Sequence, residues 1–146
     1  MKMIDVNKVV GVFIIRMLLG LIFLMQGFGK VFTWGMENVI NADFFGDTFK
    51  DILPDYVIHI TAYYTSYVEL IGGFLLVVGL RANIALYALG SVLIIVTFGH
   101  GLAEPIWDLS HVMNRTILLV ALLFLPRKWD KLSVDYLIQK HYSKKG

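Results

Sequence analysis

With 146 residues the chain has room for one domain, and 58% of its residues are hydrophobic, compared with about 45–50% in soluble proteins. The excess is gathered into four apolar blocks, which is typical of a polytopic helical membrane protein and argues against a soluble helical bundle, whose helices would each show a polar face. The absence of cysteine excludes disulfides, thiolate metal sites and CxxC redox exchange, while the net charge of +2 matters less than where the charges lie.

The apolar blocks predict an all-α fold, an integral membrane four-helix bundle in which residues 1–146 form a single domain. The spans are expected at about 9–28, 56–80, 83–101 and 112–125. The first block also has the basic start and apolar run of a signal peptide, but it is long, contains Arg16 and lacks a clear small-x-small cleavage site. We therefore expect it to be retained as a span.

The first span has a packing face and a polar end. At 100° per residue, Arg16, Gly20 and Gly27 share one face of the helix. Glycine on a membrane helix lets a neighbouring helix approach closely, so this face is expected to pack against protein. Gln26 and Lys30 form a second polar pair, one turn apart, at the far end of the span.

The segment between the first two spans is too polar to cross a membrane. Trp34 lies where an interfacial aromatic belt is expected. Apolar residues recur at helical spacing between charged ones, at Phe45, Phe49, Ile52 and Leu53. This pattern predicts an interfacial helix, and an ordinary loop packed over the mouth of the bundle is the alternative.

The second span carries a carboxylate within a long apolar run. Its small and polar residues lie on one face: Ala62, Thr65, Ser66, Glu69, Gly72, Gly73 and Leu76. A lone charge at the middle of a membrane helix costs about 2.5–3.5 kcal/mol, so Glu69 needs a partner, and we predict that Arg16 is that partner. Such an intramembrane ion pair would either line a ligand or proton path or fix the register of the helices.

Further polar side chains are predicted to converge in the outer half of the bundle, opposite the termini. They are Gln26, Lys30, Tyr63, Tyr67, His100, Asn114 and Arg115. Such a group is suited to binding an anion or the carbonyl oxygens of a quinone, and interfacial anchoring is the simpler alternative.

Other ligand chemistry has weaker support. Metal-capable side chains recur from His100 to His111, but Gly101 and Pro105 interrupt the helix that would bring them together, so no metal site is predicted. The sequence contains no phosphate-binding loop, nucleophile elbow or nucleic-acid motif, and no nucleic acid partner is expected.

Charged residues divide between the two sides of the predicted bundle. One side holds Lys2, Lys8, Arg81, Arg127, Lys128, Lys131, Lys140, Lys144 and Lys145, and the other holds Glu37, Asp43, Asp47, Asp51, Asp55, Glu104 and Asp108. The positive-inside rule then places both termini in the cytoplasm. The last residues predict a basic amphipathic helix, N-capped by Ser133, that lies on an anionic leaflet.

Several of these stretches together carry a family resemblance. They are residues 16–30 (RMLLGLIFLMQGFGK), 69–73 (ELIGG), 79–81 (GLR) and 132–135 (LSVD). Over nearly its whole length the chain resembles the DoxX family.

The resemblance implies a four-helix membrane protein of bacterial type, related to the DoxD subunit of thiosulfate:quinone oxidoreductase. Some members of the family are linked to membrane oxidoreductase assemblies that detoxify oxidants. By this analogy the shared positions are Arg16, Gln26, Lys30, Glu69 and Gly73.

Three functions remain open from the sequence. The first is a subunit or accessory of a quinone-linked oxidoreductase in the bacterial cytoplasmic (inner) membrane, with quinone as the ligand and a membrane or peripheral redox protein as partner. The second is a non-catalytic scaffold, and the third is a small-solute or proton carrier that uses Glu69. Beside the lipid bilayer, a second copy of the chain is a further partner to consider. No bound cofactor is evident in the sequence, and whether the protein is an enzyme is left open.

Overall fold

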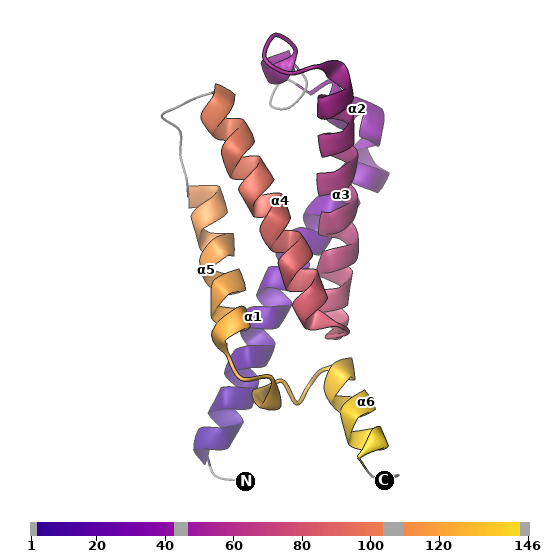
Figure 1. Ribbon diagram of the computed structural model, residues 1–146. Helices are drawn as coiled ribbons and strands as arrows, with labels where there is room; N and C mark the ends of the chain where they lie inside the picture. The colour runs from indigo at the N-terminus through magenta and orange to yellow at the C-terminus, as the bar shows by residue number, and fades with distance from the viewer. Residues whose placement is uncertain (1–2, 43–46, 104–109, 144–146) are drawn as a thin grey trace.

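The computed structural model describes residues 3–42, 47–103 and 110–143, and within these ranges the chain is helical with no strand. The elements in chain order are α1 (Met3–Phe28), η1 (Gly29–Trp34), α2 (Met36–Ile40), α3 (Asp55–Val78), α4 (Ala82–Ala103), α5 (Ser110–Phe124), η3 (Arg127–Trp129) and α6 (Val134–Tyr142). Helices α1, α3, α4 and α5 form the bundle, whereas α6 lies apart, beneath the lower ends of α3 and α4 (Figure 1). Helix α1 begins and α6 ends at the same end of the molecule, which we call the termini end.

Three of the helices are long and apolar enough to cross a membrane. In the described residues these are Asp5–Trp34, Asp55–Val78 and Ala82–Ala103, and a shorter apolar helix covers Val112–Phe124. The chain is therefore a multi-pass membrane protein. The first span differs most from its expected bounds, because its helix begins six residues before Val9 and continues past Phe28 into the π-helical turn η1.

Glycines set the contact between α1 and α3. A Cβ on Gly27 would lie 2.3 Å from the backbone N of Leu70, and one on Gly73 would lie 2.3 Å from the backbone N of Leu24. Real Cβ atoms do not approach this closely, so the two backbones touch only because these positions lack side chains. The buried face of α3 contains every residue of the predicted small and polar stripe, which confirms that interpretation.

The interior between α1, α3, α4 and α5 is apolar. Leu86 and Leu89 of α4 pack with Leu76 of α3, Phe23 of α1 and Leu122 of α5 in one buried cluster. Leu89 also contacts the space left by Gly72, where a Cβ would lie 2.9 Å from its Cγ. The charged side chains described below are therefore held at the two ends of a packed hydrocarbon core.

The connection from α1 to α3 covers the far end of the bundle. Gly35 has a φ of 81°, a conformation that favours glycine, and separates η1 from α2. Of the predicted interfacial helix, Phe45 lies outside the described residues, while Phe49 is buried and Ile52 and Leu53 close hydrogen-bonded turns onto its carbonyl. Residues 47–53 thus pack over the mouth of the bundle, and a helix lying in the membrane interface stays a prediction.

Candidate functional site

The predicted ion pair between Arg16 and Glu69 is wrong. Arg16 Nε lies 3.1 Å from Asp130 Oδ1, and Lys30 Nζ lies 2.7 Å from Glu69 Oε2. Each of the two intramembrane charges predicted from the sequence is therefore neutralised, but by a different residue and at a different end of the bundle.

The register of α1 against α3 explains the error. Gly27 packs on Leu70, so Glu69 is level with the end of α1, near Gly27 and Phe28. Arg16 precedes Gly27 by eleven residues, or roughly 16 Å of helix. The predicted spans of about 9–28 and 56–80 brought Arg16 too near Glu69, because α1 begins at Met3 and extends six residues further toward the termini end than expected.

The Lys30–Glu69 pair is the first polar centre of the molecule. Glu69 lies in the packed face of α3 with 3% of its side chain exposed, whereas Lys30 is 26% exposed. Lys30 belongs to η1, and π-helical turns are frequent at functional sites because they redirect a side chain without ending the helix. The pair thus joins a buried carboxylate to an ammonium that reaches a more open space.

Further polar groups surround this pair. The Arg115 guanidinium is close enough to Glu69 for their charges to attract, and it lies over the ring of Phe23 at 5.9 Å from the centroid. Gln26 Oε1 and Ser66 Oγ, each one helical turn from a member of the pair, are buried with no hydrogen-bond partner in the described structure. Buried polar atoms are normally paired, so these two are groups that an ordered water or a polar ligand group would satisfy.

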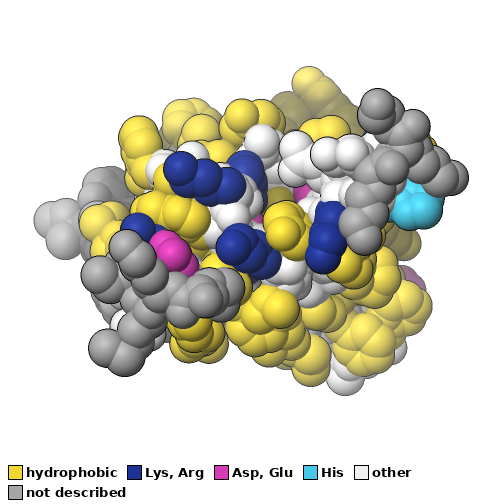
Figure 2. Space-filling view, turned by 90° about the horizontal axis from the view of Figure 1, so that it is seen from below, with side chains coloured by type: hydrophobic (Ala, Val, Ile, Leu, Met, Phe, Trp, Pro, Cys, Tyr) yellow, Lys and Arg dark blue, Asp and Glu magenta, His cyan; other side chains and the backbone are white. Residues whose placement is uncertain are grey.

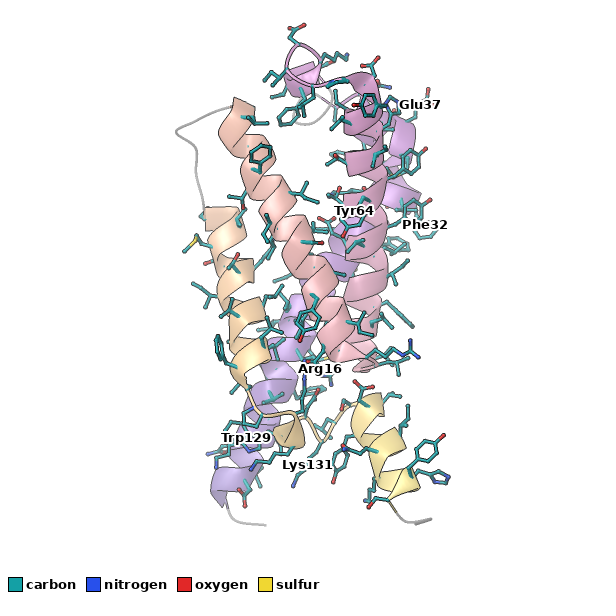
Figure 3. All side chains as sticks on the ribbon, viewed as in Figure 1. Arg16, Phe32, Glu37, Tyr64, Trp129 and Lys131 are labelled. Carbon is teal, nitrogen blue, oxygen red and sulfur yellow. The ribbon has the colours of Figure 1, made fainter. Side chains whose placement is uncertain are left out.

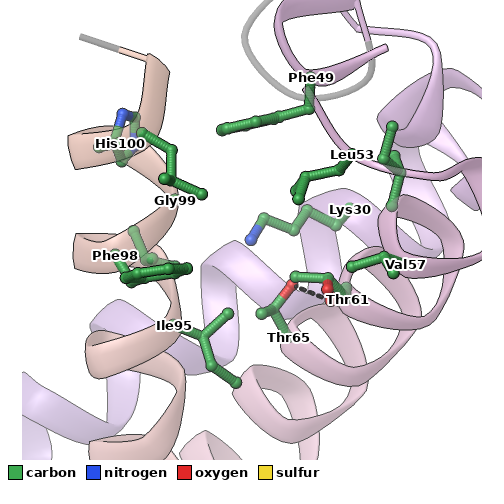
Figure 4. Close-up of a pocket in the computed structure, with 13 residues that line it drawn as sticks. Lys30, Phe49, Leu53, Val57, Thr61, Thr65, Ile95, Phe98, Gly99 and His100 are labelled. Carbon is green, nitrogen blue, oxygen red and sulfur yellow. Dashed lines mark hydrogen bonds between the residues drawn. The ribbon is translucent and has the colours of Figure 1, made fainter. Parts of the chain in front are cut away.

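Lys30 extends into a cavity at the far end of the bundle (Figure 4). The cavity has a volume of about 230 Å³ and is mostly apolar, with Ile95 and Phe98 of α4 on one side and Leu53 and Val57 on the other. Figure 4 shows Phe49 above Lys30, and Thr61 and Thr65 below it. We call this space the Lys30 cavity.

The predicted outer cluster comes together only in part. Lys30 and His100 line the Lys30 cavity, and Arg115 and Gln26 lie near the ion pair beneath it. Tyr63 and Tyr67 do not join them, because they stack on each other at 6.2 Å with 46% and 42% of their surfaces exposed. Because of the helical period of α3, the rings of Tyr63 and Tyr67 lie outside its buried face.

Asn114 and the metal-capable side chains complete the account of the predicted positions. Asn114 is exposed on α5 and does not line the cavity. Among the described residues no group of histidine and acidic side chains could hold a metal ion, and Glu104 and Asp108 lie outside these residues. The contribution of Phe49, Thr61 and Thr65 to the cavity was missed, although Thr65 was placed on the polar stripe, because the sequence pattern does not show which side chains of the loop and of α3 face α4.

Arg16 is the centre of a second polar site at the termini end (Figure 3). Besides Asp130, its guanidinium donates to the carbonyl oxygens of Leu76 and Val77 at the end of α3, and to Leu132 O at 2.7 Å. Arg16 is 1% exposed and Asp130 is 4% exposed, so both charges are buried and hydrogen-bonded. This arrangement satisfies carbonyl groups that the last turn of a helix leaves without intrahelical partners.

Hydrogen bonds hold the segment after α5 beside Arg16 and the end of α3. Ser133 donates to Asp130 O at 2.6 Å and accepts from Tyr136 N, which confirms it as the N-cap of α6. Asp135 donates its backbone N–H to Gly79 O and accepts from the N–H groups of Arg81 and Ala82. We call this group, centred on Arg16, Asp130, Ser133 and Asp135, the clasp. It closes the termini end of the bundle with polar contacts.

One comparison with known proteins gives a match. A protein-family model described as DoxX matches residues 11–101. No curated protein and no solved structure matches the chain. The matched range includes Arg16, Lys30, Glu69 and the glycines of the α1–α3 contact, whereas Asp130 and the rest of the clasp after α5 lie beyond it.

Proposed function

The chain belongs to the DoxX family, and we propose that it is a membrane subunit or accessory of a quinone-linked oxidoreductase system that binds a quinone in the Lys30 cavity. The observation that supports this proposal most is the position of Lys30. Its ammonium enters an apolar cavity while it remains paired with the buried Glu69.

The walls of the cavity fit a lipophilic ring and part of an isoprenoid tail. Small-molecule sites are mostly apolar, with a few polar groups that fix orientation. Here Phe49, Phe98 and Ile95 supply apolar and aromatic surface, while Lys30 and Thr61 supply donors. A quinone offers two carbonyl acceptors on a flat apolar ring, which matches this combination.

The ion pair would hold the donor in place. A lysine ammonium has three N–H groups, and the bond to Glu69 uses one of them. The remaining donors are available to a carbonyl oxygen in the cavity. Since Glu69 is fixed by the close contact of α3 with α1, Lys30 would keep its direction when the site is empty.

The same proposal includes an orientation in the membrane. We infer that α5 is a fourth span and that the termini end faces the cytoplasm of a bacterial cell. Helix α5 has 15 residues, or roughly 22 Å, and the clasp lengthens the bundle beneath it. The basic residues at the termini end and the acidic residues of the far end agree with the positive-inside rule.

Filling the cavity tests the proposal. Gly99 lines the Lys30 cavity on α4, and a Cβ there meets only Phe49 at an ordinary 3.5 Å, so Gly99→Leu should fold and occupy the space. Binding of a short-chain ubiquinone and a short-chain menaquinone would be titrated by quenching of the intrinsic tryptophan fluorescence. We expect wild-type protein to bind at least one of them saturably and Gly99→Leu to bind it at least about tenfold more weakly.

Gly101→Leu is the matched control, because Gly101 is near in α4, has no atom within 4 Å of its would-be Cβ and does not line the cavity. It should bind quinone as the wild type does. Equal affinity of Gly99→Leu and wild type, or no saturable binding to either quinone, would count against the proposed site.

A further inference from the structure

A second cavity lies at the termini end, between the start of α4 and the segment that leads into α6. It has a volume of about 240 Å³, and its lining includes Arg81, Asn83, Ile84, Arg127, Asp135 and Tyr136. Lysine and arginine side chains gather on this face of the molecule (Figure 2). We call this space the guanidinium cavity.

The carboxylates of the guanidinium cavity are already engaged. Asp130 is bonded to Arg16, and Asp135 accepts from the backbone N–H groups of Arg81 and Ala82. The charge of Asp135 also lies at the N-terminus of α4, where the helix dipole offsets it. Neither carboxylate therefore neutralises a guanidinium that lines the cavity.

Both guanidinium groups have N–H donors that make no hydrogen bond in the described structure. Arg127 donates twice to Asn83 Oδ1, which uses two of its five N–H groups on a neutral acceptor. Within the ranges that the structure describes, Arg81 donates a hydrogen bond from its backbone N–H and none from its guanidinium. Arg81 also has a φ of 47°, a backbone conformation that is uncommon outside glycine, held by the bond from its N–H to Asp135. The cavity thus presents two cations, with the guanidinium of Arg127 held by Asn83 and the backbone of Arg81 held by Asp135.

An apolar strip rises from the cavity along the outside of α4. Ile84 lines the cavity and is 58% exposed, and it begins a series of exposed residues that follow at helical spacing, Tyr87 at 66% and Ile94 at 72%. On a membrane-spanning helix such a strip faces hydrocarbon. The guanidinium cavity therefore lies where a lipid headgroup would meet its own acyl chains.

We propose that the guanidinium cavity is a specific site for an anionic glycerophospholipid, with its phosphodiester between Arg81 and Arg127 and an acyl chain along Ile84 and Tyr87. Guanidinium groups bind phosphate oxygens through paired, charge-assisted hydrogen bonds. Basic pockets beside membrane helices recognise anionic headgroups in this way. The site is separate from the Lys30 cavity, so it stands whether or not that cavity binds quinone.

The test uses the full-length protein in nanodiscs of phosphatidylcholine, with phosphatidylglycerol added in steps and retained lipid counted by native mass spectrometry. We expect one phosphatidylglycerol to be retained in preference to phosphatidylcholine. Arg81→Gln, which removes no described contact of the side chain, should weaken this binding about tenfold, and Arg81→Lys, which keeps the charge but not the paired hydrogen bonds, should weaken it less. Lys140→Gln is the control, because Lys140 carries the same charge on α6 without lining the cavity, and it should change binding less than twofold.

Three results would overturn the proposal. Retention of phosphatidylcholine and phosphatidylglycerol in equal amounts would show that the site does not recognise the charge of the headgroup. Equal losses in Arg81→Gln and Lys140→Gln would indicate diffuse attraction to the leaflet instead of a site. Displacement of the lipid by an excess of inorganic phosphate alone would identify the occupant as a free anion. If Arg81→Gln does not fold, as judged by gel filtration, the comparison of Arg127→Gln with Lys140→Gln decides in the same way.

Discussion

At the scale of single residues, the buried charges Arg16, Asp130 and Glu69 each lie in an ion pair with a residue of opposite charge. Glu69 has 3% of its side chain exposed and Lys30 has 26%, although they form one pair. Removing one partner of a buried pair is costly because it leaves the other charge without compensation. The cost therefore depends on which charge is left behind.

This asymmetry predicts unequal effects on stability. Lys30→Gln leaves a buried carboxylate and should lower the free energy of unfolding by about 3 kcal/mol, less whatever Arg115 offsets. Glu69→Gln leaves a partly exposed ammonium and should cost less, about 1 kcal/mol. Unfolding by sodium dodecyl sulfate in mixed micelles measures both, with Lys140→Gln as the surface control. A greater cost for Glu69→Gln than for Lys30→Gln would contradict the assignment of the pair.

Arg16 allows a second prediction at this scale. Its guanidinium serves four acceptors in different directions, on Asp130, Leu76, Val77 and Leu132, and a lysine ammonium does not have that fork geometry. Arg16→Lys should therefore release the segment after α5, and a loss of about 3 kcal/mol would raise the open population on the order of a hundredfold.

Trypsin reports this release, because Arg127, Lys128 and Lys131 lie within the fastened segment. Cleavage there should be slow in the wild type and much faster in Arg16→Lys, while Lys140→Gln should behave as the wild type does. Equal cleavage rates in wild type and Arg16→Lys would show that Arg16 does not hold the segment.

At the scale of the elements, the contact of α1 with α3 sets the register that places Lys30 beside Glu69. Gly27 and Gly73 meet the opposing backbone so closely that no side chain fits. A residue with a Cβ at Gly27 must push the helices apart, which moves Lys30 away from its partner.

Two alanine substitutions in the same helix separate packing from helix propensity. Gly27→Ala should lower the free energy of unfolding by about 2 kcal/mol, since its Cβ would meet the backbone of Leu70. Gly11→Ala has nothing within 4 Å and should be neutral or stabilise the helix by up to about 1 kcal/mol. The same micelle titration measures both variants, and equal effects of the two substitutions would rule out the close contact as the cause.

The sequence predicted the elements better than their relative positions. The face of α3 that contains Glu69 and Gly73 followed from the helical period alone, and Ser133 followed from capping preference. The partner of Arg16 could not be found in this way, because Asp130 comes 114 residues later, after the last apolar helix, in a segment with no periodic signal. The Lys30 cavity was likewise only half predicted, since Phe49 enters it from a loop whose path the local pattern does not determine.

At the scale of the whole molecule, the two ends of the bundle differ in chemistry. The far end holds the apolar Lys30 cavity, and the termini end is closed by the clasp and surrounded by basic side chains (Figures 2 and 4). The distribution of lysine and arginine predicts that the termini end is cytoplasmic.

Reporter fusions at the C-terminus test this orientation. A fluorescent protein that matures only in the cytoplasm should fluoresce there, and alkaline phosphatase at the same position should be inactive. Fusions after Ala103, at the end of α4, would extend the test to α5, and the opposite pattern of activity is expected there. Active phosphatase at the C-terminus would show that the orientation is the reverse of the predicted one, or that α5 does not cross the membrane.

The most direct test of the Lys30 cavity is to locate a bound quinone by photolabelling. A short-chain ubiquinone with a photoreactive ring substituent would be irradiated with the protein in nanodiscs, and labelled peptides would be identified by mass spectrometry. We predict that the label falls on residues 95–102 of α4 and 49–61 before and within α3, and that an excess of unlabelled quinone prevents it. Labelling confined to the outward strip of Ile84 and Tyr87, or labelling that unlabelled quinone does not reduce, would contradict the proposed site.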